Sequence, residues 1–173
     1  AKVIRGEKFN DFLFRVAGGT EASLRNIIID GNSEANKNIG KSLIEVESDA
    51  TLNINEGAVL RNNEIKAIEN TATEGGAIHA TDATINMIGG SVEENQATYG
   101  GGIYLYKTTM NFSGGVVQNN KSKLVYDKSY KQYYSAGGGI LAYGGSTLNM
   151  SGDAKVLNNF AAETSLQSYR QLL

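Results

Sequence analysis

The sequence of 173 residues contains no cysteine, no proline and a single histidine. Without cysteine the chain has no disulfides, no thiol catalysis and no thiolate metal site. One histidine, His79, excludes a metal site built from several imidazoles, and we expect neither a metal nor another cofactor. The absence of proline argues against a proline-rich linker or a polyproline ligand.

Long apolar runs and a strong charge of one sign are also missing. The longest purely apolar runs are only a few residues, as in 27–29, so we expect no membrane insertion. The net charge is −2 at pH 7, which gives no reason to expect a nucleic acid as partner. Residues 1–6 contain neither Met nor the apolar stretch of a signal peptide, and we interpret the chain as a fragment of a larger protein.

Three short elements recur in a fixed order along the chain. The first is Thr-apolar-Asn-apolar with a Gly soon after, beginning at Thr51, Thr84, Thr109 and Thr147. The second is a Val followed closely by an Asn, which gives Asn62, Asn95, Asn120 and Asn158. The third is a Gly pair leading to Ile78, Ile103 and Ile140. Repetition of this kind is typical of solenoid proteins.

The repeats are unevenly spaced. Their threonines lie 33, 25 and 38 residues apart, and the extra residues fall between the second and third elements, in 63–74 and 121–136. A turn of about 25 residues is therefore the basic unit, and two turns carry insertions at one corner. The two insertions have opposite local charge, and we expect them to pack together.

Each element alternates apolar and polar residues, as a strand with one buried face does. The apolar frame includes Met87, Met110 and Met150, which we therefore expect to point inward. Such short strands bury their apolar faces only when successive turns stack, which gives parallel, in-register ladders. The glycines fall at corners, where positive φ or close backbone approach is needed. An antiparallel sandwich is the alternative fold, although it explains identical in-register repeats less well.

Over residues 3–160 these motifs resemble the right-handed parallel β-helix of the pectate-lyase-like superfamily. The Gly-Gly-apolar-Ile and Asn-rich repeats look closest to those of bacterial surface adhesins and polymorphic outer-membrane proteins. The resemblance implies an all-β, right-handed, single-stranded parallel β-helix (solenoid) of about five to six turns over residues 1–160. Residues 161–173 lose the repeat and form a C-terminal helical cap or a tail.

The polar faces of the strands offer several candidate surfaces. We expect the asparagines of the second element to stack at a corner and satisfy backbone groups there. The Thr/Asn face of the first element is either a solvated strand face or an array that binds ice or a glycan. In the third element, His79, Tyr104 and Leu141 point outward in one column, and Thr81, Tyr106 and Tyr143 in the next. These aromatic faces suit sugar rings or a protein partner, unless residues 121–136 fold over them.

The insertion 121–136 differs in composition from the rest of the chain. It contains four lysines, one aspartate and four tyrosines. Its candidate ligand-binding residues are Lys123, Lys128, Lys131, Tyr126, Tyr130, Tyr133 and Tyr134. Long loops on rigid scaffolds often carry function, and tyrosine with lysine is typical of contact surfaces. A tolerated surface insertion is the alternative.

The acidic residues are scattered, and no motif places two of them on adjacent outward positions. We therefore predict that the chain is not an enzyme and has no catalytic residues. The resemblance implies a non-catalytic binding module of a secreted or surface-anchored bacterial protein, monomeric in isolation, whose partner is a host glycan or extracellular protein. The alternative is a structural or substrate-positioning domain of a large secreted enzyme, such as a surface metalloprotease of the immunoglobulin A1 protease type or a glycan hydrolase.

Overall fold

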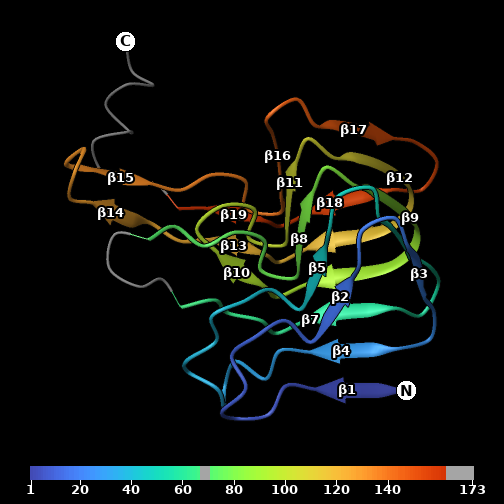
Figure 1. Ribbon diagram of the computed structural model, residues 1–173, viewed down its shortest axis with the longest axis horizontal. Coiled ribbons are helices and arrows are strands. Elements are labelled where there is room, and N and C mark those ends of the chain that lie inside the picture. Colours follow the sequence, from blue (N-terminus) through green and yellow to red (C-terminus); the bar gives the residue numbers. More distant parts are fainter. Residues whose placement is uncertain (67–70, 163–173) are drawn as a thin grey trace.

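A computed structural model describes residues 1–66 and 71–162, and every regular element in them is a β-strand (Figure 1). Nine strands form the largest sheet: β1 (Lys2–Ile4), β3 (Glu21–Leu24), β4 (Ile28–Asp30), β6 (Thr51–Ile54), β7 (Val59–Arg61), β9 (Thr84–Glu93), β12 (Thr109–Gln118), β17 (Thr147–Met150) and β18 (Lys155–Leu157). A five-stranded sheet has the order β16 (Ile140–Tyr143), β11 (Ile103–Tyr106), β8 (Ile78–Thr81), β5 (Ile44–Val46) and β2 (Phe14–Val16). A three-stranded sheet contains β10 (Gln96–Ala97), β13 (Lys121–Ser122) and β19 (Phe160–Ala161).

Strand pairing in these three sheets is parallel and joins equivalent positions of successive repeats. Thr51 pairs with Thr84, Thr84 with Thr109, and Thr109 with Thr147. The two strands β14 (Val125–Asp127) and β15 (Gln132–Tyr134) form a separate antiparallel hairpin. The chain is thus all-β with stacked parallel sheets, consistent with a parallel β-solenoid, and the antiparallel sandwich is excluded.

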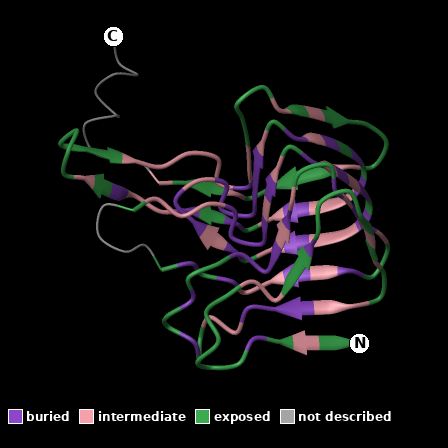
Figure 2. Ribbon diagram, viewed as in Figure 1, coloured by how far each residue is buried: buried purple, intermediate pink, exposed green. Residues whose placement is uncertain are grey.

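The core runs along the stack between the sheets. The predicted inward side chains Leu52, Met87, Met110 and Phe112 are completely buried. Met150, which was expected to be buried with them, is 48% exposed. The prediction for Met150 is wrong because β17 lies at the edge of its sheet, so that no further turn within residues 1–66 and 71–162 covers it. Figure 2 shows the same gradient, with buried strands in the middle of the stack and exposed strands at its two ends.

Asparagine side chains stack at one corner, as predicted, but in a corrected register. Asn120 accepts the backbone N–H of Asn95 at 3.0 Å, and Asn159 accepts that of Asn120 at 3.0 Å. The ladder also contains Asn63, whose N–H donates to Asn95 at 3.2 Å. The two predicted members Asn62 and Asn158 instead occupy the left-handed position before the ladder, with φ of 53° and 52°.

The predicted register was wrong in those two turns because each contains two adjacent asparagines, Asn62-Asn63 and Asn158-Asn159. Leu60, and not Val59, pairs with Val92, and that shift moves the ladder position to the second asparagine of Asn62-Asn63. The glycine pairs behave as predicted. Gly100 has φ of +60°, and a Cβ on Gly101 would overlap the carbonyl oxygens of Gly138 and Lys121 in the next turn.

Both insertions leave and re-enter the stack at matching positions. Glu64 pairs with Gln96, which pairs with Lys121, and at the far end Tyr99 bridges Glu74 and Ala136. The expected packing between the insertions is present, since Lys123 forms an ion pair with Glu64. The C-terminal cap was predicted over 161–173, of which residues 163–173 lie outside the described chain; Ala161 belongs to β19.

Candidate functional site

The outer face of the five-stranded sheet brings polar and aromatic side chains into straight columns. The first column contains Arg15, Glu45, His79, Tyr104 and Leu141, each paired in register with the next. The second contains Thr81, Tyr106 and Tyr143. We call these two columns the ladder face. The register of His79, Tyr104 and Leu141 and of the whole second column is the one that the sequence predicted, whereas Arg15 and Glu45 were not predicted.

Tyr104 departs from the prediction, because it is buried and only 7% exposed. Its ring stacks on the His79 ring with centroids 5.4 Å apart and planes 3° from parallel. The Glu74 carboxylate lies within hydrogen-bond distance of His79, with Oε2 3.2 Å from Nε2. Burial, followed by the charge of Glu74 and a hydrogen bond to it, raises the pKa of Tyr104 to about 12. Tyr104 therefore packs against the His79 ring and offers little accessible surface to a ligand.

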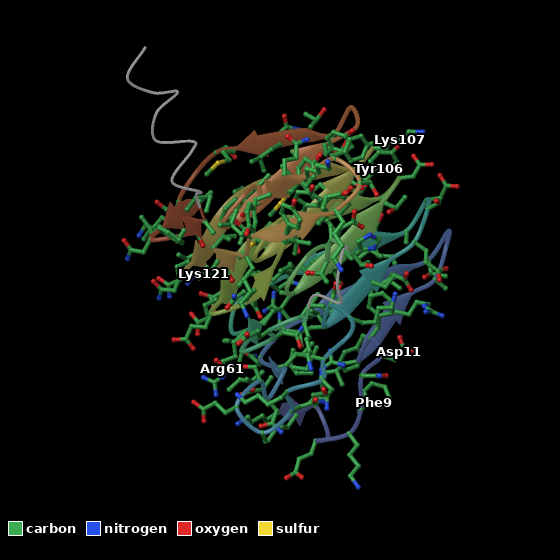
Figure 3. All side chains as sticks on the ribbon, turned by 90° about the vertical axis from the view of Figure 1, so that its left-hand side faces the viewer. Phe9, Asp11, Arg61, Tyr106, Lys107 and Lys121 are labelled. Atoms are coloured by element: carbon green, nitrogen blue, oxygen red, sulfur yellow. The ribbon has the colours of Figure 1, made fainter. Side chains whose placement is uncertain are left out.

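Tyr106 and Tyr143 supply the accessible aromatic surface of the ladder face. Tyr143 is 60% exposed, and its ring centroid lies 5.9 Å from that of the half-buried Tyr106. Lys107 Nζ lies 5.4 Å from the centroid of Tyr106, adding a cation beside the ring. Figure 3 shows Tyr106 and Lys107 together near one end of the molecule, with Asp11 near the other.

A groove opens beside His79 on the same face. It has a volume of about 600 Å³ and is lined by acidic, basic and aromatic side chains, among them Phe12, Lys41, Glu45, Glu74 and His79. A second hollow of about 370 Å³ shares Glu45 and His79 with the groove and reaches Thr81, which precedes Tyr106 in the second column. The second hollow thus extends from the groove to the strand position next to Tyr106.

Two charged side chains of the groove, Glu45 and Lys41, contact neighbouring side chains. Arg15 Nε donates to Glu45 Oε2 at 2.5 Å, and Lys41 Nζ lies 5.3 Å from the centroid of the Phe12 ring. Sequence analysis missed the groove residues Phe12, Glu45 and Glu74. The early repeats that carry Phe12 and Glu45 are degenerate, so their register with His79 was hidden. Glu74 is positioned by its bridge to Tyr99.

The other predicted ligand residues lie on the hairpin β14–β15. Tyr126 and Tyr133 face each other with centroids 4.9 Å apart, and Tyr130 at the turn is 73% exposed. Lys128 and Lys131 are also exposed at the turn. Tyr134 is half-buried, and Lys123 is occupied by Glu64.

The hairpin projects from the stack beside the three-stranded sheet (Figure 1). It does not fold over Tyr106 and Tyr143 of the ladder face, which was the alternative considered for residues 121–136. The structure therefore presents two separate aromatic surfaces, and the predicted residues do not form one site.

Within residues 1–66 and 71–162, no three acidic or histidine side chains come close enough to hold a metal ion. The same ranges contain no helix of the length and apolarity needed to cross a membrane. Comparison of the chain with protein families, with curated proteins and with solved structures finds no match in any of the three.

Proposed function

We propose that the chain is a right-handed parallel β-helix of the pectate-lyase-like superfamily and serves as a non-catalytic, glycan-binding module of a secreted or surface-anchored bacterial protein. Stacked parallel sheets, the asparagine ladder at one corner and insertions at another support the fold assignment. The binding role rests on one observation: the hollow that shares Glu45 and His79 with the groove reaches Thr81, the strand neighbour of Tyr106 in the Tyr106–Tyr143 pair.

The chemistry of this surface suits a polyhydroxylated chain. The faces of Tyr106 and Tyr143 offer flat apolar area with polar tips, which complements the apolar faces of sugar rings. The groove adds carboxylates at Glu45 and Glu74, which accept hydrogen bonds from hydroxyl groups, and Lys41, which donates them. Because both signs of charge line the groove, it favours a neutral glycan over a strongly anionic one.

The hairpin supports a second candidate, an extracellular protein partner. Its exposed tyrosines and lysines stand on a projecting element, where a flat protein surface reaches them without entering the groove. The two candidates use different residues, so one set of variants separates them.

The test is a binding screen of the wild-type chain on immobilised neutral and anionic oligosaccharides, followed by titration of the hits. Replacing Tyr106 and Tyr143 together by Ala should weaken glycan binding about tenfold or more, because aromatic residues are common binding hot spots. Replacing Tyr126 and Tyr133 by Ala serves as the matched control and should leave glycan binding unchanged.

A wild-type chain that binds no glycan in the screen would refute the glycan assignment. Glycan binding that is lost in the hairpin variant and retained in the ladder variant would move the glycan site to β14–β15. Circular dichroism of each variant checks that the β fold is retained.

A further inference from the structure

A buried arginine lies behind the groove. Arg5 directly follows β1, and it is the largest of the completely buried side chains in the described chain. Its partners are backbone carbonyls: Nη1 donates to Asp11, and Nη2 donates to Ser42 at 3.0 Å and to Lys41 at 3.3 Å. In the part of the chain that the structure describes, no carboxylate forms an ion pair with it. Arg5 is thus a buried cation that is held by peptide groups.

This arrangement is unfavourable for the stability of the fold. Removing a charge from water costs free energy, and hydrogen bonds to carbonyl groups offset only part of that cost. Burial lowers the pKa of Arg5 to about 10, against the opposing effect of the charge of Asp11. Arg5 Nε has no hydrogen-bond partner among the described residues. Apolar residues often replace buried ionic groups without loss of stability, so packing alone does not explain a guanidinium here.

The guanidinium joins two loops that are distant in sequence. Asp11 lies between β1 and β2, whereas Lys41 and Ser42 lie between β4 and β5. The N–H groups of a guanidinium point outward from one rigid plane. A single arginine can therefore bind both loops at once and fix their relative position.

These two loops form one wall of the groove beside His79. Asp11, Lys41 and Ser42 line the groove, and Arg5 does not. The Phe12 ring belongs to the first loop and also lines the groove, where Lys41 Nζ from the second loop lies 5.3 Å from its centroid. Arg5 thus binds the backbone of the lining residues from behind, at the place where the two loops meet.

We propose that Arg5 is a positioning residue of the glycan site, which holds Phe12 and Lys41 at the separation that a bound glycan needs. The inference rests on the proposed glycan-binding function of the groove. Two loops that are fixed before the ligand arrives lose less conformational entropy on binding than two free loops do. The buried guanidinium therefore contributes to affinity and not to the stability of the stack.

Hydrogen exchange tests the connection between the loops without a ligand. Arg5→Met keeps a long side chain and removes the guanidinium, so amides of residues 7–12 and 39–42 should exchange at least about tenfold faster. Arg5→Lys should act in the same way, because an ammonium lacks the planar fork that binds both loops. Amides of β12 should keep their wild-type rates. Asn120→Ala is the control, because it removes a buried polar group elsewhere in the stack and should leave exchange in the two loops unchanged.

Isothermal titration with cellohexaose, maltohexaose and chitohexaose as neutral probes tests the effect on affinity. Both Arg5 variants should weaken binding about tenfold or more, whereas Asn120→Ala should leave binding unchanged. A double-mutant cycle adds a readout that a general loss of stability does not move. Phe12→Ala should weaken binding in the wild-type background and much less in the Arg5→Met background. Tyr143→Ala should weaken binding by the same factor in both backgrounds.

The outcomes separate this inference from the proposed function. Wild-type affinity in both Arg5 variants, equal losses from Phe12→Ala in the two backgrounds, or unchanged exchange in residues 7–12 and 39–42 would each overturn the role of Arg5 and leave the glycan site standing. A wild-type chain that binds none of the three probes would refute the proposed function. It would also refute the role of Arg5 in binding, even if exchange showed that Arg5 holds the two loops together.

Discussion

At the residue scale, Asn120 connects three successive turns through one amide group. Its oxygen accepts from the backbone and side chain of Asn95, and its Nδ2 donates to the Val92 carbonyl and to Asn159, at distances of 2.9–3.0 Å. The side chain is buried, so no water replaces these partners. Asn111 makes comparable ladder bonds on the solvent-exposed face.

The two asparagines should therefore respond differently to truncation. Asn120→Ala leaves the Asn95 N–H and the Val92 carbonyl buried and unpaired, and should lower the free energy of unfolding by about 2–4 kcal/mol. Asn111→Ala leaves its partners in water and should cost less than about 1 kcal/mol. Urea unfolding followed by circular dichroism measures both; equal losses would show that burial does not control the ladder.

Because the pKa of Tyr104 is raised in the folded chain, we expect the free energy of unfolding to fall at alkaline pH. An unfolded tyrosine ionises near pH 10, whereas the pKa of folded Tyr104 is about 12. Its contribution to stability is therefore complete below about pH 10 and disappears as the pH rises to about 12. Tyr104→Phe should make the decline in urea midpoint over that range shallower. The exposed Tyr143 is the control, and Tyr143→Phe should follow the wild-type curve.

At the scale of single elements, the hairpin β14–β15 is an addition to the stack. Tyr126 and Tyr133 pack on each other, and Val125 at its base is the buried residue of the two strands. The return to the stack is fixed by a hydrogen bond from Ser135 to Ser122 at 2.6 Å and by the bridge between Tyr99 and Ala136. The ends of the hairpin are thus held by the body whether or not its tip is present.

Shortening the hairpin should leave the fold intact. Val125 and Tyr134 are antiparallel partners, so an Asn-Gly turn replacing residues 126–133 joins them in a standard two-residue hairpin. The melting temperature should fall by less than about 5 °C, since the removed side chains are mostly exposed. Calorimetry gives the answer, and loss of a cooperative transition would show that the hairpin belongs to the core.

At the scale of the whole molecule, stability should be highest in the middle of the stack. Among the described strands, β9 and β12 each have neighbours on both sides, whereas β17, β18 and β19 each have a partner on one side only. In solenoids each turn is stabilised only by its neighbours, so the ends open first. Amides of β12 should therefore exchange more slowly with deuterium than those of β17.

Core truncations should follow the same gradient. Phe112→Ala removes a completely buried ring and should cost about 3–5 kcal/mol, whereas Met150→Ala, at an exposed edge, should cost about 1 kcal/mol or less. Urea unfolding followed by circular dichroism measures both losses. A larger loss for Met150→Ala would mean that the last turn is covered in the monomer.

Much of this architecture was predictable because strand register is a local pattern repeated many times. Two-residue alternation fixed which faces point inward, and repetition of Thr-apolar-Asn-apolar placed Thr84 beside Thr109 and Tyr104 beside His79. Where the repeat is ambiguous, as at Val59-Leu60 and Asn62-Asn63, the pattern alone gave the wrong register. There, packing of Leu60 into the core decides the choice.

The sequence by itself determined the strands, their parallel order and the corner where insertions occur, because these depend on periodicity and on glycine geometry within each repeat. Only the tertiary structure decided which outward side chains stay accessible, because accessibility depends on what other segments cover. Glu74 and His79 enclose Tyr104, Met150 and Val156 stay exposed although they belong to the apolar frame, and loops distant in sequence form the groove beside His79.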